Sequence, residues 1–294
     1  VTDHFLTNAT GDDSGSKKFT NTSPMVGLTV ELTDKLNFYT TYSSAFETPT
    51  TTEFSLPGGG GGFNQDLVPQ EASNYEVALP GGIGESQRYE VSLFTIDVEN
   101  ELIGNEIPTS PGRFYFTNAG QTSRDGLEFS WTAKPTDRIR TTVSYTYSDF
   151  KYDEFIERTI ANPAGFNRAG NVIPSTPENL LFAEFSYRAP RGWFIAADAL
   201  YVDEQFGDSG NTIDNPATAA REGSEVPAYT VANMRMGWDI ELDSLVLSPF
   251  LGVTNLGDES YTANVRVNAT ANRYFEPGPL RTGYGGINVA WKFR

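Results

Sequence analysis

The chain has 294 residues, no cysteine and a net charge of −17, from 38 acidic and 21 basic side chains. This charge argues against a nucleic acid as partner, because phosphate binding requires a basic surface. Hydrophobic residues make up only 38% of the chain, and none of their runs approaches the roughly 20 residues of a membrane helix. Together with 13% aromatic residues, this composition indicates a β-rich chain without membrane helices.

The first 18 residues show little regular pattern. Residues 8–18 are typical of a polar loop. His4 is the only histidine, and we expect an ordinary surface residue there, because a catalytic histidine needs a fixed scaffold and partners. The chain begins with valine and without a signal peptide, so we expect that the front of a longer protein is absent.

From residue 25 onward, segments of alternating apolar and polar residues recur. Alternation with period two is typical of strands with one apolar and one polar face. The segments predict eleven full strands, with a partial one at residues 1–5, and the full strands are residues 25–32, 36–46, 71–79, 89–103, 114–134, 139–148, 181–187, 193–201, 234–240, 245–253 and 287–293. In the last of them, Ile287, Val289, Trp291 and Phe293 share the apolar face.

The connections between these strands alternate between short turns and long loops. Short turns fall at residues 33–35, 80–85, 135–138, 190–192 and 241–244, and long loops at residues 47–68, 104–112, 153–178, 208–227 and 258–280. Outer-membrane barrels have short periplasmic turns and long outer loops. All four tryptophans lie near short turns, as in an aromatic belt at a membrane interface. We therefore predict an all-β fold, a transmembrane antiparallel β-barrel.

Several segments resemble TonB-dependent outer-membrane receptors. Residues 253–261 (VTNLGDESY) resemble the family's NLFDKxY box, and residues 276–281 (EPGPLR) its Pro-Gly-x-Pro-Arg segment, although Leu280 precedes the arginine. Upstream, residues 70–76 (QEASNYE) are similar to a PExSxxYE strand, and residues 118–128 to an NAG…RxGxE strand. Residues 144–147 (SYTY) resemble a further strand, so the likeness covers nearly the whole chain in the family's order.

This resemblance implies a 22-stranded barrel filled by an N-terminal plug domain. Residues 1–294 then form a single partial domain, the C-terminal half of that barrel with about 11–12 strands, and the plug domain and TonB box are absent from the chain. Membership would also place the protein among the lipids of the outer membrane of a Gram-negative bacterium. The implied function is transport: a scarce ligand binds at the outer loops, and TonB, acting through the missing N-terminal part, drives its import.

For the ligand we expect a ferric siderophore. Residues 46–50, 267–268 and 272–277 resemble the subgroup that contains the pyrroloquinoline quinone receptor, so this quinone or another non-iron cofactor is the alternative. The candidate ligand-binding residues are Arg221, Arg266, Arg273, Tyr274 and Phe46. A guanidinium group pairs with carboxylates and stacks on flat rings, although each residue could equally be a solvated loop side chain, and Phe46 a girdle aromatic.

Two other classes of protein remain as distant alternatives. An outer-membrane enzyme barrel would need a nucleophile–histidine pair, and the one histidine lies in the irregular first segment, so we expect no enzyme, no catalytic residue, no metal site and no resident cofactor. A soluble adhesin would have similar loops at both strand ends and no lipid-facing tryptophan belt.

Overall fold

Eleven long antiparallel strands form one curved sheet in the computed structural model, which describes residues 2–3, 15–54, 56, 62–107, 112–158, 162, 164–214 and 223–291. The long strands are β3 (Met25–Thr33), β4 (Leu36–Glu47), β5 (Gln70–Ile83), β6 (Gln87–Glu99), β9 (Gln121–Thr136), β10 (Ile139–Glu154), β13 (Asn179–Arg188), β14 (Trp193–Val202), β17 (Tyr229–Trp238), β19 (Leu245–Thr254) and β22 (Thr282–Trp291). The two-residue β18 (Ile240–Glu241) follows β17 and also pairs with β19.

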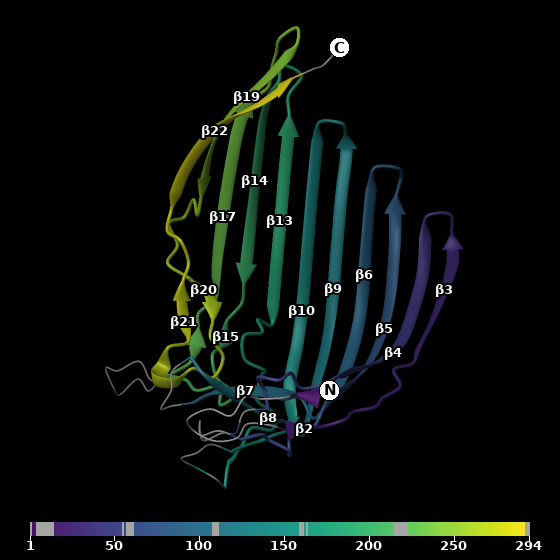
Figure 1. Ribbon diagram of the computed structural model, residues 1–294. Helices are drawn as coiled ribbons and strands as arrows, with labels where there is room; N and C mark the ends of the chain where they lie inside the picture. Colours follow the sequence, from purple (N-terminus) through teal and green to yellow (C-terminus); the bar gives the residue numbers. More distant parts are fainter. Residues whose placement is uncertain are drawn as a thin grey trace.

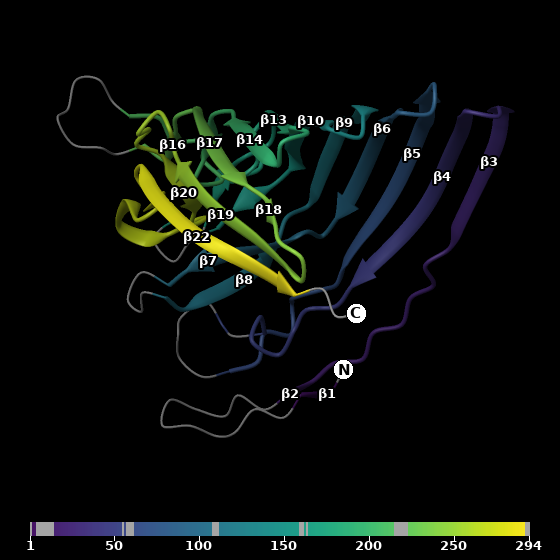
Figure 2. The same ribbon diagram turned by 90° about the horizontal axis from the view of Figure 1, so that it is seen from above.

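Each long strand pairs with the next long strand along the chain, from β3 to β22. The sheet therefore is an up-and-down meander, and Figures 1 and 2 show it rolled into an open arc with β3 and β22 at its two ends. Within the described residues, β3 pairs only with β4, and β22 only with β19. The predicted all-β fold and antiparallel barrel architecture are confirmed.

Two predicted strands are divided in the structure. The strand predicted at residues 89–103 ends at Glu99, because Asn100 has a φ of 56° that breaks the extended backbone. The strand predicted at residues 114–134 is two strands, β8 (Phe114–Asn118) and β9, separated at Ala119 and Gly120. The hairpin of β7 (Leu102–Glu106) and β8 thus belongs to the long loop between β6 and β9.

The outer face of the sheet is apolar. Register pairs align large exposed side chains across it, such as Met236 with Leu251, and Leu251 is 68% exposed and Ile287 65% exposed. The four tryptophans lie on this face near the short turns: Trp193 is opposite Trp238, Trp131 is opposite Tyr89, and Trp291 is opposite Leu245. A soluble protein rarely leaves so continuous an apolar surface in water, whereas lipid tails cover it in a membrane.

The inner face carries the polar members of each alternation. It includes Arg124, Glu128, Arg140, Glu184, Asp198 and Arg235. Neighbouring strands satisfy some of these groups directly: Asn233 donates a hydrogen bond to Asp198 over 2.6 Å. Among the described residues, no helix is long and apolar enough to cross a bilayer.

The two ends of the sheet differ in construction. Short turns join the strands at the upper end in Figure 1, and long loops lie at the lower end. The long loops build small hairpins of their own: β7–β8, β11 (Ile156–Glu157) with β12 (Phe166–Asn167), β15 (Gln205–Phe206) with β16 (Glu225–Val226), and β20 (Thr262–Val265) with β21 (Phe275–Pro277). A small buried core of Ile103, Ala119, Tyr152 and Phe155 lies at this end.

Candidate functional site

Three long-loop segments and the end of β10 meet in a partly buried polar cluster, which we call the loop junction. It consists of Glu106 in β7, Tyr152 at the end of β10, Ser209 after β15, and Asn268 and Arg273 between β20 and β21. Hydrogen bonds join these residues although they lie up to 167 positions apart in the sequence. The junction holds the loops together at the long-loop end of the sheet.

Glu106 is the centre of one half of the junction. Its side chain has no exposed surface, and both carboxylate oxygens accept several hydrogen bonds. The Thr270 backbone N–H donates over 2.7 Å, the Thr270 hydroxyl over 2.8 Å, and the Gly112 backbone N–H over 2.5 Å. Arg273 Nη2 lies 2.8 and 2.9 Å from the two oxygens. A buried carboxylate needs this many donors, because an uncompensated charge is costly away from water.

The same contacts keep Glu106 ionised. Burial alone opposes ionisation, but the hydrogen bonds from Thr270, Gly112 and Arg273 outweigh it and lower the pKa of the Glu106 carboxyl from 4.5 to about 2. Arg273 therefore faces a permanent negative charge at neutral pH. Its guanidinium group is held in one orientation, with its Nε also donating to the Thr270 carbonyl over 3.0 Å.

Asn268 and Ser209 form the other half of the junction. Ser209 is fully buried; its backbone N–H donates to Asn268 Oδ1 over 3.0 Å, and its hydroxyl lies 3.1 Å from the Tyr152 hydroxyl. Asn268 Nδ2 donates to the Gly104 carbonyl of β7 over 3.2 Å. Asn268 has a φ of 52°, a conformation that asparagine tolerates better than most residues.

Tyr274 and Arg266 flank the junction. Tyr274 is only 8% exposed, and its ring lies against the backbone of Gly207, where a Cβ would come within 2.7 Å of it. Burial and the nearby Asp208 carboxylate raise the pKa of the Tyr274 hydroxyl to about 12. Arg266 Nη2 lies 3.9 Å from Glu106, and its Nε lies 3.8 Å from Glu276.

The structure brings three of the five candidate residues together: Arg266, Arg273 and Tyr274 all lie at the junction. Phe46 is elsewhere, on the apolar outer face opposite Glu71 at the long-loop end of β4. Arg221 lies outside the described residues, and so does His4. Sequence reasoning missed Glu106 and Ser209, since nothing local marks a single acid or serine as the partner of a loop more than 50 positions away.

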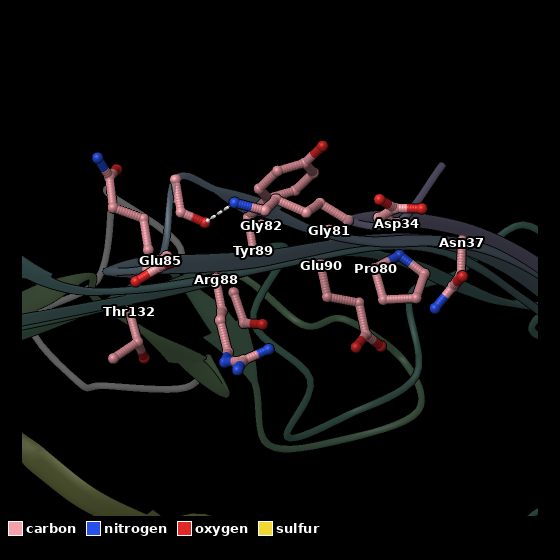
Figure 3. A pocket seen from close by; sticks show the side chains of 14 residues that line it. Asp34, Asn37, Pro80, Gly81, Gly82, Glu85, Arg88, Tyr89, Glu90 and Thr132 are labelled. Carbon is pink, nitrogen blue, oxygen red and sulfur yellow. Dashed lines mark hydrogen bonds between the residues drawn. The ribbon is translucent and has the colours of Figure 1, made fainter. Parts of the chain in front are cut away.

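The opposite end of the sheet has a shallow polar hollow between the first two short turns, shown in Figure 3. Lys35 Nζ donates to the Gly84 carbonyl over 2.9 Å and so joins the two turns. Arg88, Glu90 and Thr132 extend from one face of the sheet and Tyr89 from the other, which is the predicted alternation. Among the residues that the structure describes, no group of three or more His, Cys, Asp or Glu side chains could hold a metal ion.

The sequence also matches a known family: residues 2–256 fit the description "TonB dependent receptor-like, beta-barrel". The chain belongs to this family. As a TonB-dependent receptor β-barrel, it lies in the outer membrane of Gram-negative bacteria, with its apolar face toward lipid. By the architecture of such barrels, its short turns face the periplasm and its long loops the outside.

Relatives of this receptor barrel agree with the assignment. The chain is 26% identical over 264 residues to a ferrioxamine B receptor of Salmonella typhimurium, covering 87% of this chain and 32% of that protein. It is 24% identical over 204 residues to a ferrioxamine receptor of Yersinia enterocolitica, covering 67% of this chain and 25% of that protein. The chain thus spans a quarter to a third of the length of these relatives.

Solved structures share the fold. A ferric citrate transporter in its unliganded form superposes with a TM-score of 0.68 at 20% identity, covering 91% of this chain and 38% of that one. The siderophore receptor PiuA of Acinetobacter baumannii also reaches 0.68, at 18% identity, covering 90% of this chain and 35% of that one. At such low identity the likeness establishes the barrel fold alone.

The segments that resemble TonB-dependent receptors have structural roles in this chain. Asn255 is 1% exposed with a φ of 52°, and its Nδ2 donates to the Glu259 and Pro279 carbonyls over 2.8 and 3.1 Å. It thereby ties residues 253–261 to residues 276–281. In the upstream segment, Asn118 exchanges hydrogen bonds with the Val68 backbone over 3.0 and 2.9 Å. These contacts fasten the loops to the strand ends.

Proposed function

We propose that this chain forms part of an outer-membrane receptor that binds a ferric siderophore at its long loops and imports it with energy transmitted by TonB. The observation that carries the proposal is the family match over residues 2–256. It is supported by the relatives whose names refer to ferrioxamine. TonB would act through a part of the receptor that this chain does not include.

For the ligand contacts we propose the exposed flank of the loop junction. The side chains of Arg266 and Arg273 are 35% and 43% exposed, so each has guanidinium surface left after its contacts with Glu106. Guanidinium groups bind paired oxygen atoms in a fixed geometry, and the oxygen-rich shell of an iron chelate offers such pairs. Tyr274 would act by positioning this segment, since its ring is buried.

The two remaining candidates have weaker support. Arg221 stays a proposed contact on its sequence position alone. Phe46 lies on the outer face, where an aromatic side chain suits the membrane interface better than a ligand site. We therefore place the ligand beside Arg266 and Arg273 and not beside Phe46.

Calorimetry tests the ligand class on the receptor that carries this chain, purified in detergent. Ferric siderophores of the hydroxamate, catecholate and carboxylate types are compared with pyrroloquinoline quinone. We expect submicromolar binding of one ferric siderophore and none of the quinone. Tight binding of the quinone alone would contradict the siderophore proposal and support the quinone as the ligand. Binding of neither would refute both ligands.

Arg266→Ala tests the place of the ligand. The expected loss of affinity is at least tenfold, or about 1.4 kcal/mol, with Arg138→Ala as control because Arg138 is an exposed arginine of a short turn at the opposite end of the sheet. Unchanged affinity in Arg266→Ala would remove this residue from the site. Growth of cells on the bound siderophore as iron source, with and without TonB, tests the import step, and growth that persists without TonB would contradict it.

A further inference from the structure

A second cavity lies on the outer face of the sheet, far from the loop junction. It spans strands β14, β17, β19 and β22 and has a volume of about 640 Å³, within the roughly 300–1,000 Å³ range of small-molecule sites. We call it the outer groove and define it by Ile195, Met236, Trp238, Leu251, Gly285 and Ile287. Nothing in the transport mechanism uses it.

Register places the outer groove on the lipid side. Ile195 is opposite Met236, Met236 is opposite Leu251, and Leu251 is opposite Gly285, so these four positions form one row across four strands. The row belongs to the same face as the tryptophans. The adjacent row points the other way: it contains Arg235, whose guanidinium lies 5.7 and 6.0 Å from the rings of Phe194 and Phe250.

A missing side chain creates the groove. Gly285 leaves the row open between Leu251 and Ile287, which are 68% and 65% exposed. A Cβ at Gly285 would come within 2.8 Å of Leu251 Cδ2, so a larger residue there would fill the hollow and push the leucine aside. Gly283, two residues earlier on the same face, has nothing within 4 Å of such a Cβ and lines no part of the groove.

Trp193 and Trp238 close the groove at its short-turn end. They are opposite each other in the register, and tryptophans of this kind mark the level of lipid headgroups. The turn between β13 and β14 adjoins them: Asp239 donates its N–H to the Gly192 carbonyl over 2.8 Å. Arg191 is exposed in this turn and, among the described residues, forms no ion pair with a carboxylate.

We propose that the outer groove binds one phospholipid of the inner leaflet of the outer membrane. An acyl chain lies along Met236, Leu251 and Ile287 over Gly285, and the phosphate lies between the tryptophan pair and Arg191. The occupant is a lipid because the groove is continuous with the face that meets the bilayer. It is a phospholipid of the periplasmic leaflet because the groove ends at the short turns, and a guanidinium binds phosphate oxygens.

Gly285→Leu tests the acyl site, with Gly283→Leu as the matched control. The receptor that carries this chain is purified in mild detergent, and its bound lipids are counted by native mass spectrometry and identified after extraction. We expect the unchanged receptor and Gly283→Leu to retain one more phospholipid than Gly285→Leu. Equal retention in all three proteins, or retention of lipopolysaccharide in place of phospholipid, would refute the proposal.

Arg191→Ala tests the headgroup contact without altering the groove. In a titration with a phospholipid that carries bromine on its acyl chains, quenching of tryptophan fluorescence reports occupancy. We expect the half-saturating lipid concentration to rise about tenfold in Arg191→Ala and to stay unchanged in Arg281→Ala, at the other end of β22. An unchanged titration in Arg191→Ala would show that the phosphate does not bind at this turn.

Discussion

At the scale of single residues, the buried Glu106 side chain connects two loops that are far apart in the sequence. Its carboxylate joins β7 to the segment around Arg273, 167 positions later, and it has no exposed surface. Arg266 and Arg273 could be chosen from the sequence as loop cations, but their orientation could not, because the acid that orients them is not local. Sequence reasoning therefore predicts the residue types of this site better than its geometry.

Glu106→Gln should loosen the junction. The amide offers one acceptor oxygen in place of two and leaves Arg273 without its counter-charge, which we expect to cost about 3 kcal/mol, since hydrogen bonds to charged groups contribute about 1.5–3 kcal/mol each. Limited proteolysis measures the effect as faster cleavage within residues 100–120. Glu276→Gln is the control, because the Glu276 side chain is 52% exposed; equal cleavage in both variants would contradict the prediction.

The junction should also open in acid. The pKa of Glu106 is lowered from 4.5 to about 2, so its ionised form stabilises the folded loops fully at neutral pH. This stabilisation is lost as the pH falls from about 4.5 through about 2. Hydrogen exchange of the Thr270 and Gly112 amides at pH 7 and pH 3 measures it, and we expect faster opening at pH 3. In Glu106→Gln the difference between the two pH values should shrink.

At the scale of elements, the strands were the most predictable part. Each of the eleven predicted segments overlaps a long strand of the main sheet, because period-two alternation directly reflects a sheet between lipid and a polar interior. The loops were not predictable, since β7, β11 and β15 belong to short hairpins inside the loops that show no long alternating pattern. The sequence also did not predict the strand ends at Asn100 and Gly120. Gly120 is required by a contact with a distant residue, because a Cβ there would lie 2.7 Å from the Glu154 carbonyl oxygen.

Glycine and aromatic side chains also pair across neighbouring strands. Phe94 is opposite Gly126, and a Cβ on Gly126 would lie 2.2 Å from the Phe94 ring and 2.8 Å from the Tyr147 carbonyl oxygen. The ring therefore lies directly against the glycine. This explains the glycine of residues 124–128, which the sequence could identify only by its resemblance to other receptors.

Gly126→Val should destabilise the sheet where Phe94 packs. The branched side chain must displace both a ring and a backbone carbonyl, and overpacking of this kind costs about 1–3 kcal/mol. Thermal unfolding in detergent measures it as a lower midpoint. Gly283→Val, with open space around its Cβ, should unfold like the unchanged protein, and equal midpoints for the two variants would contradict the role of Gly126.

At the scale of the whole molecule, the apolar outer face of the sheet determines which environment the protein needs. Leu251, Ile287 and Trp291 are each more than 60% exposed, so the barrel requires lipid or detergent around it. We expect the receptor that carries this chain to sediment with outer membranes and to be released only by detergent. Recovery in the soluble fraction would favour the adhesin alternative and contradict a membrane-facing surface.

The loop junction has a consequence for the order in which the chain folds. Each long strand of the main sheet pairs with the next long strand along the chain, so the sheet can grow by adding one strand after another. The Glu106–Arg273 contact spans 167 positions and can close only after the six intervening long strands are in place. Contacts of large sequence separation form late, because the entropy of closing a long loop opposes them. The junction is thus a marker of completed assembly, and a chain with a misplaced strand should lack it even where its local hairpins are intact.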